Sequence, residues 1–397
     1  MTRVYVTGLG VVSAIGLNVM ENVNSLRSQK TGIGRNTLFT TKLNVPVGQV
    51  KCSNEDICTL LGLQVKQGVS RTALLGMLAA KEALEDAGVD SGYKNRGFIS
   101  ATSVGGMDLS ENFYKLYRAD NSSGDLHDLL MHDCGASTKA IASYLNIDGF
   151  TTTISTACSS ASNAIMLGAR LIKQGLLDTV VVGGTDALCR FTMNGFNSLL
   201  ILDQELCRPF DNSRNGLNLG EGAGYLVLQS DKVITPNKKP YCELTGYSNV
   251  NEAYHQTGSS PEGDGALDAM NEALRIAQIA PEEIDYINVH GTGTPTNDYS
   301  EGMAMKRLFG EHMPPFSSVK SYIGHTLGAS EGIEAVYSAL SVKEGFLYPN
   351  LNFNTSIEGL GLQPQMEWKE RESLRNVLSN SFGFGGSNSS LIFSLIK

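Results

Sequence analysis

The chain has 397 residues, of which 41% are hydrophobic and 18% charged, so it can bury a large core and is not a disordered chain. Its formal net charge of −9 argues against a nucleic-acid binder, which would be basic. Seven cysteines without a C-x-x-C pair exclude a zinc ribbon and a thioredoxin-like motif, and they fit a reducing, cytoplasmic setting. No apolar run reaches the length of a transmembrane helix, so we expect no membrane insertion.

Strand candidates are short β-branched runs ending in glycine or small residues, and they form two sets of five. The first set is 4–9, 97–102, 150–156, 179–187 and 224–229, and the second is 242–247, 286–290, 315–319, 376–381 and 390–395. A helix is predicted after the third strand of each set and another before the second strand, over 159–174, 330–344, 73–87 and 266–279. This order predicts two α/β halves, residues 1–240 and 241–397, with an insertion of helices and loops at about 107–146.

The first cluster of chemical interest is Ser155-Thr-Ala-Cys158-Ser-Ser-Ala-Ser162, where a strand ends, a tight turn follows and a helix begins. Cys158 is therefore expected at a helix N-terminus, whose free N–H groups and dipole stabilise a thiolate. A buried structural cysteine is the alternative, and we adopt it for the other six cysteines.

Two histidines stand at predicted strand ends in the second half. His290 opens the stretch His290-Gly-Thr292-Gly-Thr294, whose hydroxyls and bare backbone suit an amide-bearing substrate arm. His325 follows Lys320 in a connection between a strand and a helix. Because ligands of open α/β sheets bind beyond the carboxyl ends of strands, we expect both histidines to meet Cys158.

A fourth cluster, Asn380-Ser-Phe-Gly383-Phe384-Gly-Gly386, leaves backbone N–H groups exposed, as an oxyanion hole needs. A metal site is another use for one cysteine and two histidines. The spacings of 132 and 35 residues match no compact zinc pattern, and few carboxylates stand nearby to orient the rings. We therefore expect no catalytic transition metal.

These clusters, in this order, resemble those of the elongating, Cys-His-His class of β-ketoacyl-[acyl-carrier-protein] synthases in the thiolase superfamily. The similarity extends from Val6-Thr-Gly-Leu-Gly10 to Phe384-Gly-Gly386, and includes Arg208-Pro-Phe-Asp211 and Gly220-Glu-Gly-Ala-Gly224. The resemblance implies a thiolase-like α/β fold, a duplicated five-layer α/β/α/β/α sandwich. It also implies a homodimer with a sheet continued across the interface, and an acyl carrier protein as partner.

The implied reaction is a decarboxylative Claisen condensation. Cys158 takes an acyl group from its carrier protein, and malonyl-carrier protein then loses carbon dioxide and attacks the acyl-cysteine to give a β-ketoacyl thioester. By resemblance, the N–H groups of Cys158 and Phe384 hold the oxyanions, and His290 and His325 donate to the developing enolate. Whether either histidine also acts as a base stays open. Lys320 would orient the histidines and pair with Glu334, although a purely structural ion pair is an equal alternative.

Other roles follow from the same resemblance. Thr292 and Thr294 match positions that hydrogen-bond the phosphopantetheine arm, Thr257 falls in a further matching stretch, and Phe384 also matches a gating aromatic. Val104, Met107 and Phe196 fall where the family lines its acyl pocket, although simple core positions are an equal alternative. No cofactor is implied, because phosphopantetheine is carried by the substrate. A structural Na⁺ or K⁺ is implied in some relatives, by residues that match Asn288, Glu334, Ser379 and Asn380.

The chain departs from the family pattern after its second histidine. It reads Gly328-Ala-Ser-Glu331-Gly-Ile-Glu334, so Glu331 stands where the family has a small residue. The stretches at 102–111 and 216–220 are also unusual. These departures leave two pathways open, general fatty acid synthesis or a specialised polyene-like product.

Related functions can be weighed on single residues. A thiolase needs a second cysteine near the C-terminus, but the last cysteine here is Cys242. A starter-condensing synthase pairs cysteine with histidine and asparagine, whereas His325 occupies the third position. A chain-length partner subunit lacks the nucleophile, which Cys158 supplies. The remaining alternative is the active subunit of a heterodimer with such a partner.

An acidic enzyme needs a local basic patch to dock an acidic carrier protein. Lys66 and Arg71 flank the first long helix in positions that resemble the family's docking site. Plain solvated charge is the alternative for each of them.

Overall fold

The computed structural model describes residues 2–64, 68–89, 95–234, 239–371 and 374–396. Its ten long-sheet strands correspond one to one with the ten predicted strands. They are β1 (Val4–Val12), β2 (Arg96–Ala101), β3 (Phe150–Ile154), β4 (Thr179–Asp186), β5 (Gly222–Ser230), β6 (Cys242–Asn251), β7 (Tyr286–Asn288), β8 (Phe316–Ser317), β11 (Asn376–Gly383) and β12 (Ser387–Ser394). A small extra sheet, which was not predicted, pairs β9 (Phe346–Leu347) with β10 (Lys369–Glu370).

The order of strands across the sheet shows the repeat that the order of elements along the chain predicts. The long sheet runs β3-β2-β4-β5-β1-β6-β12-β11-β7-β8. Counting strands within each half, both halves have the order 3-2-4-5-1, and the two first strands meet edge to edge. That junction is antiparallel and short, pairing Tyr5 with Glu243 and Val6 with Cys242.

The helices are α1 (Val19–Arg27), α2 (Asn54–Leu61), α3 (Arg71–Ala87), α4 (Met107–Ala119), α5 (Cys134–Tyr144), α6 (Ser160–Lys173), α7 (Arg190–Ser198), α8 (Asp264–Ala277), α9 (Pro295–Phe309), α10 (Lys320–Ile323) and α11 (Ser330–Glu344). Short 3₁₀ turns are η1 (Leu126–Met131), η2 (Pro281–Glu283) and η3 (Leu327–Ala329). The predicted helices over 73–87, 159–174, 266–279 and 330–344 are α3, α6, α8 and α11. Among the described residues, no helix is long and apolar enough to cross a bilayer.

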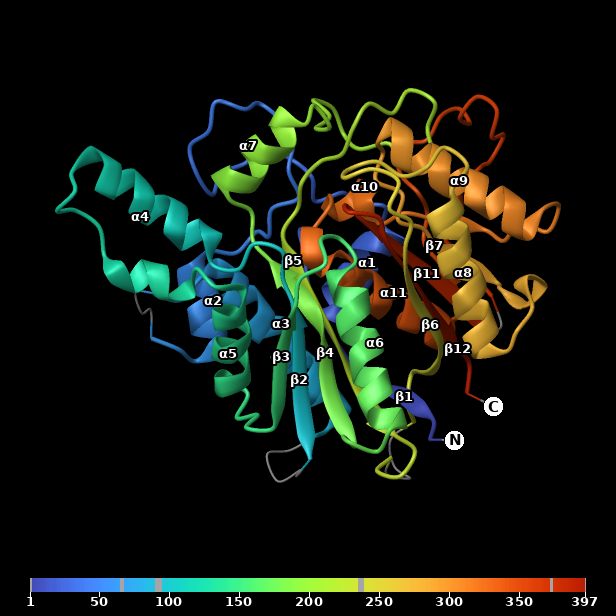
Figure 1. The fold of residues 1–397 in the computed structure, drawn as a ribbon, viewed down its shortest axis with the longest axis horizontal. Coiled ribbons are helices and arrows are strands. Elements are labelled where there is room, and N and C mark those ends of the chain that lie inside the picture. Colours follow the sequence, from blue (N-terminus) through green and yellow to red (C-terminus); the bar gives the residue numbers. More distant parts are fainter. Residues whose placement is uncertain (1, 65–67, 90–94, 235–238, 372–373, 397) are drawn as a thin grey trace.

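Two helices separate the halves. Both α6 and α11 contact strands of the first half and strands of the second, so they form a middle layer. Helices α3 and α5 cover the outer face of the first half, and α8 and α9 cover that of the second (Figure 1). The result is the five-layer α/β/α/β/α arrangement that the family resemblance implied.

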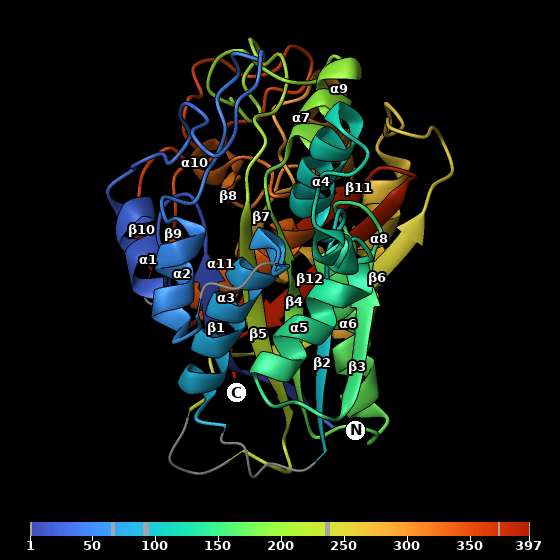
Figure 2. The same cartoon turned by 90° about the vertical axis from the view of Figure 1, so that its left-hand side faces the viewer.

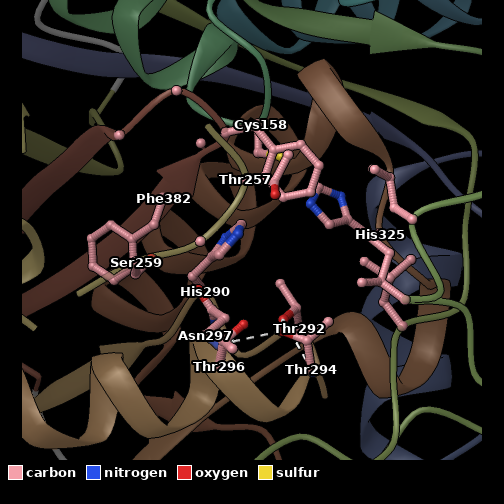
Figure 3. Close-up of a pocket in the computed structure, with 18 residues that line it drawn as sticks. Cys158, Thr257, Ser259, His290, Thr292, Thr294, Thr296, Asn297, His325 and Phe382 are labelled. Carbon is pink, nitrogen blue, oxygen red and sulfur yellow. Dashed lines mark hydrogen bonds between the residues drawn. The ribbon is translucent and has the colours of Figure 1, made fainter. Parts of the chain in front are cut away.

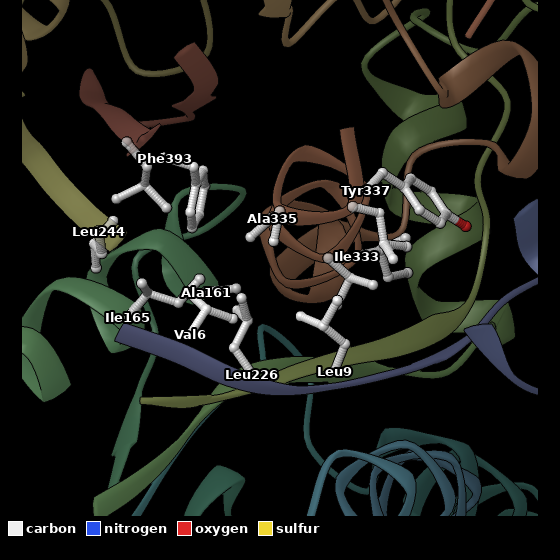
Figure 4. Packing of buried hydrophobic residues seen from close by; sticks show 14 of the residues in the cluster. Val6, Leu9, Ala161, Ile165, Leu226, Leu244, Ile333, Ala335, Tyr337 and Phe393 are labelled. Atoms are coloured by element: carbon white, nitrogen blue, oxygen red, sulfur yellow. The ribbon is translucent and has the colours of Figure 1, made fainter. Parts of the chain in front are cut away.

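The largest hydrophobic cluster lies in this middle layer. It joins Leu9 and Leu226 of the first half, Phe393 of the second half, Ile165 of α6 and Ile333 of α11, all buried (Figure 4). Because one cluster is shared, neither half has a complete core of its own.

The predicted insertion is only partly an insertion. Helix α5 packs on α3 and on strands β2 and β3, and it occupies the place in its half that α9 occupies in the other. Between β2 and β3, the extra elements are therefore α4 and η1. Helix α4 lies beside α7 (Figure 2), and Glu111 of α4 accepts from Arg190 of α7 at 2.9 Å.

Candidate active site

Cys158 lies in the turn between β3 and α6, as predicted, and is 5% exposed. Ala157 before it has φ +53°, in the left-handed region that non-glycine residues rarely adopt. The Ser160 hydroxyl ties the turn together, accepting from Thr156 N at 2.8 Å and donating to Ala157 O at 2.5 Å. From β11 of the second half, the Ser381 hydroxyl donates to Cys158 O at 2.9 Å. Both halves therefore hold the cysteine in place.

The Cys158 sulfur is surrounded by groups that could stabilise an oxyanion. The backbone N–H groups of Phe384 and of Cys158 itself lie close enough to Sγ to lower the pKa of the thiol. Phe384 is brought there by the β11–β12 turn, in which Gly385 and Gly386 have φ of 84° and 79°. These two donors are the pair predicted to form the oxyanion hole.

Burial raises the pKa of Cys158 to about 11, opposed by the charge of Lys320 and by the N–H groups of Phe384 and Cys158. The resting group at neutral pH is therefore a thiol. This differs from the thiolate predicted from the helix N-terminus, because the sequence pattern carries no measure of desolvation.

His290 follows β7 and is 2% exposed. The N–H groups of His290 and Gly291 donate to the Glu301 carboxylate of α9, each at 2.9 Å. Lys320 Nζ lies 3.3 Å from His290 Nδ1 and donates to His290 O at 2.6 Å. Because an ammonium group only donates, Nδ1 is the acceptor, and the ring proton of the neutral imidazole is on Nε2.

His325 has the same tautomer for a different reason. The Leu327 N–H donates to His325 Nδ1 at 3.0 Å, and the Ser330 hydroxyl lies 3.1 Å from the same atom. The pKa values of His325 and His290 are both well below the ordinary value, because of burial first and the Lys320 charge next. Two neutral rings therefore offer Nε2–H donors.

The cysteine and the two histidines meet, as predicted. One ligating atom from each lies within 4.8 Å of the others, and the two imidazole centroids are 5.4 Å apart. Such spacing could in principle bind a metal. However, a metal-bound histidine donates its other ring N–H, whereas here each Nδ1 accepts and each Nε2 carries the proton. The geometry thus favours hydrogen-bond donation over metal ligation.

Lys320 and Glu334 form the predicted ion pair. Nζ to Oε1 is 2.5 Å, and each side chain is 1% exposed. Lys320 belongs to α10 and Glu334 to α11, so the pair ties the histidine connection to the middle layer.

A cavity of about 100 Å³ opens beside the three residues (Figure 3). As predicted, Thr257, Thr292, Thr294 and Phe384 line it. Sequence reasoning missed eight further residues of its lining: Leu199, Ile201, Leu217, Gly258, Ser259, Thr296, Asn297 and Phe382. Thr296 and Asn297 directly follow the predicted threonines, so the same loop could have indicated them. Leu199, Ile201 and Leu217 are ordinary apolar residues, and no motif in the sequence marks them as site residues.

The predicted acyl-pocket residues are only partly brought together. Phe196 of α7 stacks on Phe384, with centroids 5.8 Å apart and an interplanar angle of 19°. Val104 is absent from the cavity lining, and Met107 lines a separate apolar pocket of about 470 Å³ with Phe113, Tyr114 and Phe191. Phe196, Val104 and Met107 are therefore all absent from the lining of that cavity, although Phe196 stacks on Phe384, which lines it.

The predicted docking role of Arg71 is wrong in this structure. Its side chain is 5% exposed and pairs with the buried Glu221 at 2.7 Å. That partner lies 150 residues further along the chain, so no local pattern could indicate it. Lys66, the other docking prediction, lies outside the described residues.

The residues predicted to bind a monovalent cation lie near one another, and the cation itself stays a prediction. The Asn288 side-chain oxygen accepts from Tyr348 OH, and the Asn380 side-chain oxygen accepts from Ser390 Oγ at 2.8 Å. Each of these amide oxygens keeps a second lone pair, and one Glu334 oxygen has no hydrogen-bond partner, so the residues still offer oxygen ligands. The Glu331 carboxyl also interacts with Ser379 and Glu334, the other two.

Comparison with known proteins agrees with this geometry. The N-terminal domain model of β-ketoacyl synthases matches residues 1–233, and the C-terminal domain model matches residues 241–354. The chain is 33% identical to 3-oxoacyl-[acyl-carrier-protein] synthase 2 of Coxiella burnetii, over 99% of each chain. The fold and the paired domains together define a thiolase-fold ketosynthase. This chain belongs to the β-ketoacyl synthase family.

Two solved structures are close in fold. A chain of the ishigamide ketosynthase/chain length factor superposes with a TM-score of 0.94 at 29% identity, over 100% of both chains. A chain of AntDE:AntF, a type II polyketide acyl-carrier protein in complex with its ketosynthase, superposes with a TM-score of 0.89 at 27% identity, again over 100% of both.

Proposed function

We propose that this chain condenses an acyl group with malonyl-carrier protein to give a β-ketoacyl-carrier protein and carbon dioxide. The observation that carries the proposal is the meeting of Cys158, His290 and His325 within 4.8 Å. The sulfur faces two backbone donors, and two neutral imidazoles offer Nε2–H groups.

In the first half-reaction, Cys158 Sγ attacks the thioester carbonyl. The N–H groups of Cys158 and Phe384, which favour the thiolate of Cys158, stabilise the oxyanion of the tetrahedral intermediate. The carrier's C–S bond breaks, and its sulfur leaves as a thiol with the proton that Cys158 gave up. The product is an acyl-cysteine.

In the second half-reaction, malonyl-carrier protein loses carbon dioxide. The electron pair of the broken C–C bond moves toward the malonyl thioester oxygen, where the Nε2–H groups of His290 and His325 stabilise the enolate. The enolate carbon then attacks the acyl-cysteine carbonyl, and the Cys158 C–S bond breaks. The departing thiolate takes up one proton, which balances the loss of carbon dioxide from the carboxylate.

Acyl carrier protein is the proposed partner, because one similar ketosynthase structure contains one. We also propose a dimer, and a homodimer first. Strand β3 is an edge strand with a neighbour on one side only, and its Phe150 is 44% exposed. A second chain can extend the sheet there. Seven free cysteines suit the cytoplasm as the site of the reaction.

A second candidate is the active subunit of a heterodimer with a chain-length partner. The similarity to the ishigamide ketosynthase/chain length factor supports it. So does a group of exposed apolar side chains on α4, η1 and α7 that a partner could cover: Tyr114, Leu116, Tyr117, Leu126, Leu130 and Phe191.

The test is intact-protein mass after the purified chain is mixed with acyl-carrier protein, followed by malonyl-carrier protein. We expect an acyl adduct that is absent in Cys158→Ala and that disappears as β-ketoacyl product forms. An adduct that malonyl-carrier protein cannot discharge favours the heterodimer. Absence of any adduct across acyl chain lengths would contradict the catalytic function.

A further inference from the structure

Asp186, the last residue of β4, is a buried acid that the proposed mechanism does not use. It is 0% exposed. Its carboxylate accepts from four donors: Thr102 Oγ1 at 2.5 Å, Ser103 N at 2.9 Å, Val104 N at 3.3 Å and Gly328 N at 2.8 Å. Burial raises its pKa to about 6 and the four donors oppose that shift, so the group is a carboxylate at neutral pH.

The four donors come from two segments that are far apart in the sequence. Residues 102–104 form the turn that follows β2 in the first half. Gly328 belongs to η3 in the second half, and its bond to Asp186 spans 142 residues. Asp186 therefore joins the first half to the connection that carries His325.

The backbone of Gly328 is packed tightly at this junction. An added Cβ on Gly328 would meet Ser103 Oγ at 2.8 Å and Asp186 Oδ2 at 2.9 Å. An added Cβ on Gly184 of β4 would meet Gly328 O at 2.6 Å. Gly328 is therefore held by contact with β4 and with the turn after β2, in addition to its hydrogen bond.

Leu327, the residue before Gly328, is held in a conformation that non-glycine residues rarely adopt. Its φ is +54°, in the left-handed region. Such a conformation persists only where the surrounding contacts fix it. The bond from Gly328 N to Asp186 fixes the peptide group that joins Leu327 to Gly328. The contact with Asp186 therefore helps to keep Leu327 left-handed.

The tautomer of His325 depends on the position of Leu327. The backbone of His325 is held separately, because its N–H donates to Asn218 O and its carbonyl accepts from Gly220 N. Its Nδ1, however, accepts from Leu327 N at 3.0 Å, and the Ser330 hydroxyl at 3.1 Å can either donate or accept. If the Leu327 N–H turned away, Nδ1 could carry the proton and donate to Ser330. The Nε2 atom would then lose the hydrogen that stabilises an enolate.

We propose that Asp186 is a positioning residue for His325. Its carboxylate holds Gly328, which keeps Leu327 left-handed and so keeps the ring proton of His325 on Nε2. The catalytic value of this arrangement rests on the proposed function, because the enolate is what uses the Nε2–H group, whereas the tautomer of His325 does not rest on it.

The first test is the His325 tautomer in Asp186→Asn. The amide has nearly the shape of the carboxylate but only one acceptor oxygen. Three donors reach Oδ1 and two reach Oδ2, so we expect the amide oxygen at the Oδ1 position and the nitrogen facing Gly328. Nitrogen NMR of labelled imidazoles should then show the His325 proton moving from Nε2 toward Nδ1. Comparison with His325→Asn identifies the His325 signals.

A second variant breaks the same contact from the other side. Gly328→Ala leaves the Asp186 carboxylate unchanged, but its methyl group would displace the carboxylate, and we expect the same shift of the His325 tautomer. Glu82→Gln is the matched control. Glu82 of α3 also accepts two distant backbone N–H groups, those of Val11 and Val19 at 2.9 and 2.8 Å, and none of these residues lines the cavity. This control should leave the His325 tautomer unchanged.

An unchanged His325 tautomer in either variant of the contact would overturn the proposal, whether or not the chain condenses substrates. Where Asp186→Asn does not fold, Gly328→Ala decides alone. A shift of the same size in Glu82→Gln would mean that the tautomer follows general stability, which also contradicts the proposal.

The two half-reactions provide a separate readout for Asp186→Asn. Decarboxylation of malonyl-carrier protein should fall by roughly tenfold to a hundredfold, because His325 no longer presents its Nε2–H group. Acylation of Cys158 uses backbone donors and should stay within a few fold. Equal losses in the two half-reactions would mean that Asp186 serves stability only. A wild-type chain that performs neither half-reaction would contradict the proposed function, and the NMR comparison would still decide the role of Asp186.

Discussion

The two halves share one strand order but differ in the connection that follows their third strand. In the first half, five residues join β3 to α6 and place Cys158 in a tight turn with a left-handed Ala157. In the second half, twelve residues join β8 to α11, and they include α10 and η3. The longer connection carries Lys320 and His325.

The difference shows how a duplicated fold divides one reaction. The short turn leaves room for a nucleophile and its two backbone donors. The long connection has enough chain to hold a cation behind one imidazole, at 3.3 Å from His290 Nδ1, and to reach the cysteine with another imidazole. The same topology therefore supplies covalent chemistry from one half and enolate stabilisation from the other.

Removing the nucleophile should have the largest effect, because the first half then supplies no covalent chemistry. Cys158→Ala leaves the second half intact but has no sulfur to acylate, so condensation should fall on the order of 10⁴-fold or more. The measurement is product formation from acyl- and malonyl-carrier protein. Cys242→Ala, another buried cysteine but in β6, is the control and should stay within a few fold. Similar losses in the two variants would mean that Cys158 has no special role.

The pH dependence of Cys158 reactivity tests whether the short turn stabilises a thiolate. With the pKa raised to about 11, the reactive thiolate fraction grows about tenfold for each pH unit above neutrality. Alkylation by iodoacetamide, followed by mass spectrometry of the Cys158 peptide, should therefore speed up about a thousandfold from pH 7 to pH 10. A small thiol such as glutathione levels off earlier and serves as the control. A plateau near neutrality would show that the helix N-terminus outweighs burial.

Two variants of the long connection can separate its contribution to stability from its contribution to catalysis. Lys320→Met leaves Glu334 as an unpaired buried charge and should cost about 3–5 kcal/mol of unfolding free energy. It also removes a charge that lowers the pKa of His290. Condensation should fall by roughly a hundredfold.

The double variant Lys320→Met/Glu334→Gln decides between the two roles. It removes the unpaired charge, so its melting temperature should recover, while condensation stays low because His290 has lost its donor. Calorimetry and a decarboxylation assay make the comparison. Recovery of both quantities would mean that the ion pair is only structural.

The smallest effect concerns backbone strain in the short turn. Ala157 has φ +53°, which costs a non-glycine residue about 1–2 kcal/mol. Ala157→Gly should therefore raise the unfolding free energy by about 1 kcal/mol, measured by chemical denaturation. Gly88→Ala, at φ +64° at the end of α3 with no atom within 4 Å of an added Cβ, makes the opposite change and should lower it by a similar amount. A loss of stability in Ala157→Gly would mean that the turn is not strained.

Much of the fold could be predicted because it depends on local pattern. Ten short β-branched runs became the ten strands of the long sheet, and α11 has the predicted bounds. The pairing of β1 with β6 could not be predicted, because it joins residues about 240 positions apart through two residue pairs. Helix α5 falls within the predicted insertion at 107–146, because its equivalence to α9 is visible only in three dimensions.

The site shows the same limit. Cys158, His290 and His325 stand in glycine-rich strand ends that a reader of the sequence can find. The tautomer of His325 depends on the Leu327 backbone, and the resting state of Cys158 depends on burial. The loss of Arg71 from the surface depends on Glu221. Each of these features depends on packing between segments that are distant in the sequence. Composition and motif spacing therefore do not reveal it.

The shared middle layer has a consequence for synthesis of the chain. Helix α11 covers β4 and β5 of the first half, but its last residue is made about 110 residues after β5 ends. At 5–20 residues per second, the ribosome needs on the order of 6–22 s to supply that cover. During this time the nascent first half exposes an apolar face to water. A fragment ending near residue 240 should therefore need a chaperone to remain dispersed.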